Sequence, residues 1–128
     1  GPGIEHALSA MIHPHHAVGR AAEDRALQAL RAAGLRLCER NFRIRRGEID
    51  LVMTDNEEVV FVEVRARRGG LYGDGIDSIT RAKRRRLTAA ASAWLQRQPG
   101  EPPARFDVVA VAPDGSTTWI RDAFRPDE

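Results

Sequence analysis

Hydrophobic and polar positions alternate along this chain with two distinct periods, which predict an order of helices and strands. Between residues 18 and 33 the apolar side chains recur at helical spacing, and Gly34 supplies the stop. Shorter segments with alternating or continuous apolar residues, separated by polar turns, predict strands. Asp77 or Ser78 is the expected N-cap of a second helix. In chain order we expect helix 18–33, strands 35–46, 48–54 and 59–65, helix 77–98, and strands 105–112 and 117–121.

This element order indicates an α/β domain in which a mixed central sheet is flanked by helices. The chain has 128 residues, of which 42% are hydrophobic and 30% are charged, which is enough for one core and argues against wholesale disorder. No apolar run approaches the roughly 20 residues that span a bilayer, and the first residues lack the features of a signal peptide. We expect one domain at residues 17–125, tails at 1–16 and 126–128, and no contact with membranes. Because the single cysteine, Cys38, cannot form an internal disulfide, we expect a cytoplasmic protein.

The basic residues are concentrated in three segments, although the net charge is only +2. Residues 36–46 hold five arginines against one glutamate, residues 65–68 hold three arginines, and residues 81–86 hold five basic residues. Such clusters are typical of a surface that binds a polyanion such as nucleic acid, and the alternative is an ordinary solvated face. Lys83 is the only lysine in the chain, because every other basic residue is an arginine.

Four charged residues are expected on one face of the hairpin formed by the second and third strands. Strand alternation places Glu48, Asp50 and Val52 on one face of the second strand, and it places Glu63 and Arg65 together on the third. With a hairpin turn centred at residues 56–57, Asp50 lies opposite Glu63. Like charges directly opposite each other destabilise a sheet, so this pair needs a cation such as Mg²⁺ or Mn²⁺. The alternative is that each acid pairs with a nearby arginine, or that another register separates the two acids.

The two predicted helices each direct one charged side chain toward the core. At about 100° per residue, Glu23 lies close to the apolar stripe of the first helix. By the same spacing, Lys83 lies near the centre of the stripe that includes Leu87 in the second helix. Each is explicable alone, as a salt-bridged glutamate or as a lysine whose stem crosses apolar surface. Together with Asp50 and Glu63, however, they have the composition of a metal site that hydrolyses phosphodiester bonds.

A combination of motifs in these elements points to a family resemblance. The motifs are Glu23 in the first helix, GEIDL at residues 47–51, FVEVRAR at residues 61–67, Lys83, and RFD at residues 105–107. They resemble those of the YraN-like family, whose members are expected to be endonucleases and which is itself similar to archaeal Holliday junction resolvases of the PD-(D/E)xK nuclease superfamily. The resemblance extends over nearly all of the chain, from about Val18 to Phe124.

The resemblance implies a restriction-endonuclease-like αβββαβ core and a metal-dependent reaction. Asp50 and Glu63 are the implied ligands of Mg²⁺ or Mn²⁺. The carbonyl group of Val64 is implied as a further ligand, and Glu23 as a residue that assists through the metal or its bound water.

One residue departs from the family pattern. The Glu-x-Lys motif of the family would place lysine at position 65, where this chain has Arg65. An arginine stabilises negative charge in a transition state but does not serve as a base, so catalysis is weakened or lost unless another residue substitutes. Our hypothesis is that Lys83 reaches the site and takes over part of this role. The alternatives are that Lys83 contacts DNA phosphate, or that it forms a salt bridge with Glu23 or Glu63.

These features predict a metal-dependent endonuclease that acts on DNA, and the resemblance to resolvases extends the prediction to branched or otherwise structured DNA. A symmetric homodimer is expected by the same analogy, because resolvases cut two strands. Clustering alone selects the residues expected to contact phosphate, which are Arg43, Arg45, Arg46, Arg67, Arg68 and Arg84. The alternative, motivated by Arg65, is a catalytically silent nucleic-acid-binding domain that binds without cleaving.

Overall fold

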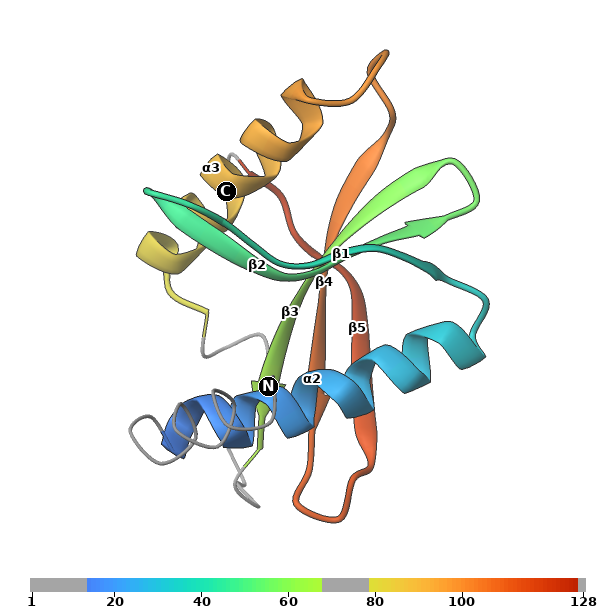
Figure 1. Ribbon diagram of the computed structural model, residues 1–128, viewed down its shortest axis with the longest axis vertical. Helices are drawn as coiled ribbons and strands as arrows, with labels where there is room; N and C mark the ends of the chain where they lie inside the picture. Colours follow the sequence, from blue (N-terminus) through green and yellow to red (C-terminus); the bar gives the residue numbers. More distant parts are fainter. Residues whose placement is uncertain (1–13, 68–78, 127–128) are drawn as a thin grey trace, which may run out of the picture.

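The computed structural model of this chain describes residues 14–67 and 79–126, with side chains from residue 19 onward. Two helices and five strands lie in this part of the chain (Figure 1). In chain order they are α2 (Pro14–Ala32), β1 (Arg36–Ile44), β2 (Gly47–Asp55), β3 (Glu58–Ala66), α3 (Arg81–Gln96), β4 (Ala104–Val111) and β5 (Thr117–Phe124). The predicted order of helices and strands is confirmed.

The five strands form one mixed sheet in the order β1-β2-β3-β4-β5. β3 and β4 are parallel, and every other pair of neighbours is antiparallel. The parallel pair is connected through α3, because two parallel neighbours need a long crossover between them. The result is an α/β fold that is compatible with the expected restriction-endonuclease-like core.

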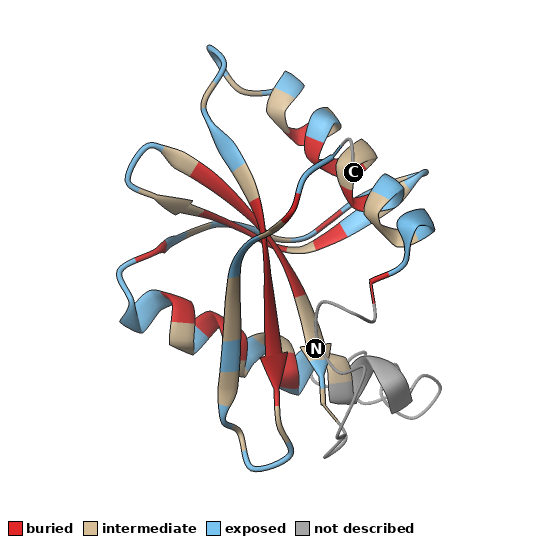
Figure 2. Cartoon of the chain, turned by 180° about the vertical axis from the view of Figure 1, so that it is seen from behind, coloured by how far each residue is buried: buried red, intermediate tan, exposed pale blue. Residues whose placement is uncertain are grey.

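The two helices pack on opposite faces of the sheet, as the two hydrophobic clusters show. Val52 of β2 packs in a cluster with Leu87 and Trp94 of α3. Its neighbours Leu51 and Met53 pack in a second cluster with residues of α2. Figure 2 shows the buried residues along the middle strands and on the inner sides of both helices. Burial on both faces explains the nearly continuous apolar runs of these strands and holds them in fixed positions.

The helices begin at different residues from the predicted ones. α2 begins at Pro14, so part of the segment expected to be a tail belongs to this helix. α3 begins at Arg81 and is capped by Thr80, whose Oγ1 accepts a hydrogen bond of 3.1 Å from the backbone nitrogen of Lys83. The expected N-cap at 77–78 lies outside the described residues. Neither helix, as far as the structure describes the chain, has the length and apolar character needed to cross a membrane.

The hairpin of β2 and β3 has the predicted register. Its last main-chain pair is Leu51 opposite Val62. At the other end, Asn56 occupies the two-residue turn with φ 58°, a left-handed conformation that asparagine tolerates better than most residues. The next residues in register beyond the last pair are Asp50 and Glu63, the two acids that sequence alternation placed opposite each other.

Candidate functional site

The candidate site forms where β2 separates from β3. Beyond Leu51, β2 no longer pairs with β3 but continues along β1 as far as Gly47. Ile49 packs in the same α3 cluster as Val52, three positions away, which strict alternation does not allow. The prediction that Asp50 shares a face with Val52 is therefore wrong, because the strand twists as it leaves its neighbour. Asp50 instead lines a cavity on the side of α2.

The Asp50 carboxyl links the two strands beyond the point where their main chains pair. Its Oδ2 accepts a hydrogen bond of 2.8 Å from the backbone nitrogen of Val64. Burial, together with the negative charge of Glu63, raises the pKa of Asp50 from 3.8 to about 8, although the hydrogen bond from Val64 opposes the rise. Without a bound cation, Asp50 is therefore mostly protonated at neutral pH. The proton relieves the repulsion between the Asp50 and Glu63 carboxylates, which we expected a cation to relieve.

Glu63 is buried and pairs with a cation from α3. It is only 7% exposed. Lys83 Nζ lies 2.8 Å from Glu63 Oε1, and Arg65 Nη1 lies 3.9 Å from the same oxygen. Lys83 stands in the first turn of α3, which the Thr80 cap fixes in place. The predicted inward direction of Lys83 is confirmed, and of the two glutamates expected as its ion-pair partner the structure selects Glu63 over Glu23.

Glu23 enters the site from α2. It lines, with Glu48 and Asp50, a cavity of about 270 Å³ that we call the acidic cavity, and Arg20 and Arg43 line the same cavity. The side chain of Glu23 is 14% exposed, and Arg40 Nη2 lies 3.3 Å from its Oε1. Burial raises the pKa of Glu23, and the hydrogen bond and charge of Arg40 oppose the rise. The predicted core-facing direction of Glu23 is confirmed, and it brings this residue to the same cavity as Asp50.

The three acids that line the acidic cavity supply hard carboxylate oxygens, the ligands that Mg²⁺ and Mn²⁺ prefer, although the two arginines of the cavity oppose a cation. Within residues 14–67 and 79–126, however, no three or more histidine, cysteine, aspartate or glutamate side chains are grouped closely enough to hold a metal ion. Glu63 is engaged with Lys83 and lines the neighbouring groove rather than this cavity. Metal ligation by Glu23, Asp50, Glu63 and the Val64 carbonyl therefore stays a prediction.

A basic groove of about 440 Å³ lies beside the acidic cavity. The charged residues that line it are Arg43, Arg45, Arg46, Glu48, Glu63, Lys83 and Arg86. Arg43 Nε lies 2.9 Å from Glu48 Oε2, so this pair is neutralised. Arg45, Arg46 and Arg86 are exposed, and none of them has an ion-pair partner in the described part of the chain. Three guanidinium groups without a counter-charge, beside a buried acid and lysine, favour a polyanionic ligand.

The other arginines expected to contact phosphate do not line this groove. Arg84 is half-buried, and its guanidinium lies over the Phe124 ring at 5.3 Å from the centroid, so apolar packing against β5 holds it. Arg67 is half-buried at the end of β3, where its Nη1 donates a hydrogen bond of 3.4 Å to Thr118. Arg68 lies outside the described residues. The expected set therefore divides, and the arginines of 43–46 are the ones placed beside Glu63.

Arg86 is a groove residue that the site prediction missed. The signal was present, because Arg86 follows Lys83 by three positions and so lies on the same side of α3. The turn between β1 and β2 lies directly against α3 at this point, since a Cβ atom at Gly47 would collide with the backbone carbonyl of Arg86. Only glycine allows the turn between β1 and β2 to approach the helix so closely.

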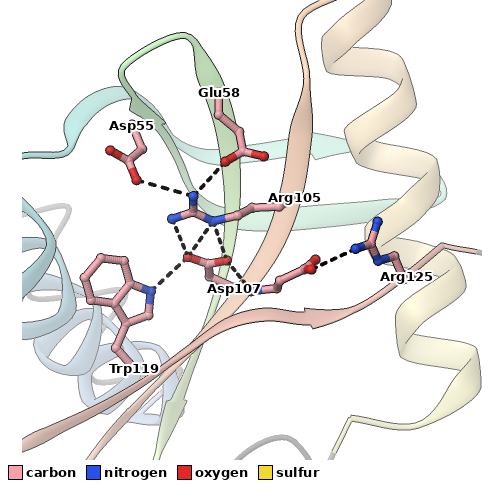
Figure 3. Close-up of polar contacts among 7 residues, drawn as sticks. Asp55, Glu58, Arg105, Asp107, Trp119 and Arg125 are labelled. Carbon is pink, nitrogen blue, oxygen red and sulfur yellow. Dashed lines mark hydrogen bonds and ion pairs between the residues drawn. The ribbon is translucent and has the colours of Figure 1, made fainter.

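A second buried acid belongs to a separate, structural network (Figure 3). Asp107 is fully buried and accepts hydrogen bonds from the guanidinium of Arg105, from Trp119 Nε1 at 2.8 Å and from the backbone nitrogen of Asp122 at 2.9 Å. Arg105 also donates to Glu58 Oε1 at 2.7 Å. Burial alone would lower the pKa of Arg105, but the hydrogen bonds and charges of Asp107 and Glu58 outweigh it and raise that pKa above its ordinary value. The network connects the β2–β3 hairpin turn to β4 and β5, and protein groups alone satisfy the buried Asp107 carboxylate.

Comparison with known proteins places these features in a family. The sequence model of the uncharacterised protein family UPF0102 matches residues 22–111, a range that contains Glu23, Asp50, Glu63 and Lys83. A UPF0102 protein of Nitrosococcus oceani is 52% identical over 87% of this chain and 94% of its own length. Similar proteins of Halorhodospira halophila and Ralstonia nicotianae are 56% and 54% identical, each over 84% of this chain and 86% of their own length. By family model and by relatives alike, the chain belongs to the UPF0102 family.

Proposed function

We propose that this protein is a metal-dependent endonuclease that cleaves phosphodiester bonds of DNA. The observation that carries the proposal is that the Asp50 carboxyl and the Glu63–Lys83 ion pair lie where β2 separates from β3. The groove beside them holds three arginines that have no ion-pair partner among the described residues. Carboxylates such as Asp50 and Glu63 are the usual ligands of Mg²⁺ and Mn²⁺. A groove lined by arginines binds the phosphate backbone of DNA. The resemblance to PD-(D/E)xK nucleases supports the same interpretation.

Each residue has a defined role in this proposal. Asp50 and Glu63 hold Mg²⁺ or Mn²⁺, with the Val64 carbonyl and Glu23 assisting. When bound, the cation polarises the phosphoryl oxygen and lowers the pKa of a coordinated water. Lys83 and Arg65 supply positive charge next to Glu63, where charge develops on the phosphate during hydrolysis.

The basic groove binds the DNA backbone in this proposal. Arg45, Arg46 and Arg86 contact phosphates, which carry no sequence information, so binding is expected to depend on salt more than on sequence. Branched DNA as the preferred substrate, and a homodimer that cuts two strands, extend the proposal by analogy to the resolvases.

A second candidate function is a nucleic-acid-binding domain without catalysis. Two observations favour it: Arg65 replaces the motif lysine, and Glu63 is engaged by Lys83 instead of standing free for a metal. In this second candidate function, the basic groove binds nucleic acid but the protein does not hydrolyse phosphodiester bonds.

Cleavage of labelled duplex, single-stranded and four-way-junction DNA with Mg²⁺ or Mn²⁺ tests the proposal. We expect cleavage by the wild-type chain and a loss of at least about 100-fold in Glu63→Gln, as is usual for removal of a group that stabilises the transition state. Glu57→Gln is the matched control, because Glu57 is an exposed acid in the β2–β3 turn. Binding that weakens with salt, without cleavage under either metal, would establish the second candidate instead.

Lys83 and the groove are tested in the same assay. Lys83→Ala is expected to abolish cleavage while leaving salt-dependent binding in place, and full cleavage by this variant would refute the role given to Lys83. Arg46→Gln is expected to reduce the slope of log K against log salt by about 0.9, the contribution of one phosphate contact. Sedimentation with and without junction DNA reports whether the active species is a dimer.

A further inference from the structure

Asn41 of β1 lines the acidic cavity with Glu23 and Asp50 and has an unusual backbone conformation. Its φ is 53°, in the left-handed region that L-residues rarely adopt. In the β1–β2 ladder, the residue before Asn41 pairs with Leu51 and the residue after it pairs with Ile49. Asn41 therefore lies opposite Asp50, and both residues line the acidic cavity. Backbone outliers that a fold retains are often found at functional sites.

The Asn41 amide faces the carboxyl group of Glu23. With its amide nitrogen turned toward Glu23, Asn41 donates to Oε1 and to Oε2, each at 3.2 Å. One amide thus contacts both carboxylate oxygens and restricts rotation of the carboxyl group. Asn41 thus contacts Glu23 of α2 from β1, at a position where the backbone is left-handed.

Arg40 approaches the same carboxyl group from the adjacent position. Its Nη2 lies 3.3 Å from Glu23 Oε1 and 2.8 Å from Asp24 Oδ1, so the guanidinium bridges two consecutive acids of α2. Its Nε is buried and has no hydrogen-bond partner among the described residues. A buried donor left unpaired costs stability. Side chains that retain such a donor often have a functional role.

We propose that Arg40 and Asn41 are positioning residues that hold the Glu23 carboxylate in one orientation in the acidic cavity, facing Asp50, where it serves as a cation ligand. The inference rests on the proposed function for its final step, the binding of a cation. Its first step, the fixed orientation of Glu23, stands on the contacts alone. A glutamate side chain has three rotatable bonds, and fixing them before a ligand arrives removes an entropic cost from binding.

The arrangement also separates positioning from ligation. Asn41 and Arg40 belong to β1, whereas Glu23 belongs to α2 and Asp50 to β2. Partners that orient a metal ligand typically change metal affinity 10- to 100-fold when they are removed, without contacting the metal. Substitutions of Arg40 and Asn41 are thus expected to change the affinity for a cation. They are expected to leave the affinity for DNA unchanged, because the basic groove binds DNA in the proposed function.

The first test measures whether the Glu23 side chain is held in one rotamer. Three-bond NMR couplings report its χ1 angle in the wild-type chain, in Asn41→Gly and in Arg40→Met. Glycine keeps the left-handed conformation at position 41, so it removes the amide without adding strain. Asn56→Gly is the matched control, since Asn56 is an exposed asparagine with φ 58° in the β2–β3 turn. We expect one rotamer in the wild-type chain and the control, and averaged couplings in the two cavity variants. One unchanged rotamer in both would overturn the proposal.

The second test measures binding of Mn²⁺ by electron paramagnetic resonance. We expect the dissociation constant to rise by about 10- to 100-fold in Asn41→Gly and in Arg40→Met, with Arg40→Lys in between. Salt-dependent DNA binding in EDTA is expected to stay unchanged in every variant. Equal Mn²⁺ affinity in all variants would overturn the positioning role. A wild-type chain that binds no Mn²⁺ would contradict the proposed function and the ligand role of Glu23, whereas the fixed orientation of Glu23 would still stand or fall with the NMR couplings.

Discussion

Replacing Asp50 with asparagine is expected to stabilise the protein while it destroys the candidate site. Asparagine has the shape of a protonated aspartate, and its oxygen keeps the hydrogen bond from the backbone nitrogen of Val64. Like the protonated carboxyl, its amide group carries no charge. What the substitution removes is the charge that burial and Glu63 make unfavourable in the folded chain.

The sign and size of the effect follow from the pKa of Asp50, which is 3.8 in its ordinary state and about 8 in the fold. Below the lower value the carboxyl is protonated in both states and folding does not depend on pH. Between the two values the unfolded chain releases the proton and the folded chain keeps it, so the free energy of unfolding falls as pH rises, and the loss is complete above the higher value. A difference of roughly four units, at about 1.4 kcal/mol each, sets a ceiling of about 6 kcal/mol. We expect about 2 to 4 kcal/mol, because solvent reaches part of this site.

Urea unfolding in EDTA, from pH 4.5 to pH 9, measures this effect. The quantity to follow is the free energy of unfolding of Asp50→Asn minus that of the wild-type chain, because contributions of titrating groups that do not interact with Asp50 cancel in the difference. It is expected to grow with pH for Asp50→Asn and to stay flat for Glu57→Gln, an exposed acid of the same hairpin. If the difference in the free energy of unfolding for Asp50→Asn does not change with pH, the raised pKa of Asp50 is refuted. The unfavourable charge that we assign to Asp50 without a cation is then refuted as well.

Two further predictions concern the framework around the site. Arg105→Met leaves a fully buried carboxylate without its main partner and is expected to cost about 3 to 5 kcal/mol in chemical unfolding; Arg125→Met, which breaks an exposed ion pair, should cost less than about 1 kcal/mol, and equal costs would contradict the structural role of the network. Gly47→Ala drives a methyl group into the Arg86 carbonyl and is expected to cost about 1 to 3 kcal/mol and to weaken DNA binding. A variant with unchanged stability and binding would show that the turn is free to move.

Several features of the fold follow from the sequence by itself. The periods of apolar residues predict the two helices and five strands of the described residues, because secondary structure exposes one face and buries the other at a fixed spacing. The same spacing predicts the inward direction of Glu23 and Lys83. The turn at 56–57 follows from local composition, and it fixes the register that brings Asp50 and Glu63 to the same level of the hairpin.

Other features were decided only by tertiary structure. Strand alternation does not reveal that β2 leaves β3 after Leu51, because separation of two strands depends on the competing pairing with β1. It therefore does not reveal that Asp50 turns toward α2. The choice of Glu63 as partner of Lys83 depends on how α3 docks on the sheet.

The same limit explains the arginines and the buried network. Clustering along the chain does not distinguish Arg84, which packs over Phe124, from Arg86, which lines the basic groove. Asn41 gave no signal in the local pattern, because its partner Glu23 lies on another element, and Asp107 was noted only as part of the RFD motif, which does not reveal its contacts with β5. Local spacing determines which side of an element a residue occupies, whereas its partner there is set by the packing of elements that the chain brings together from far apart.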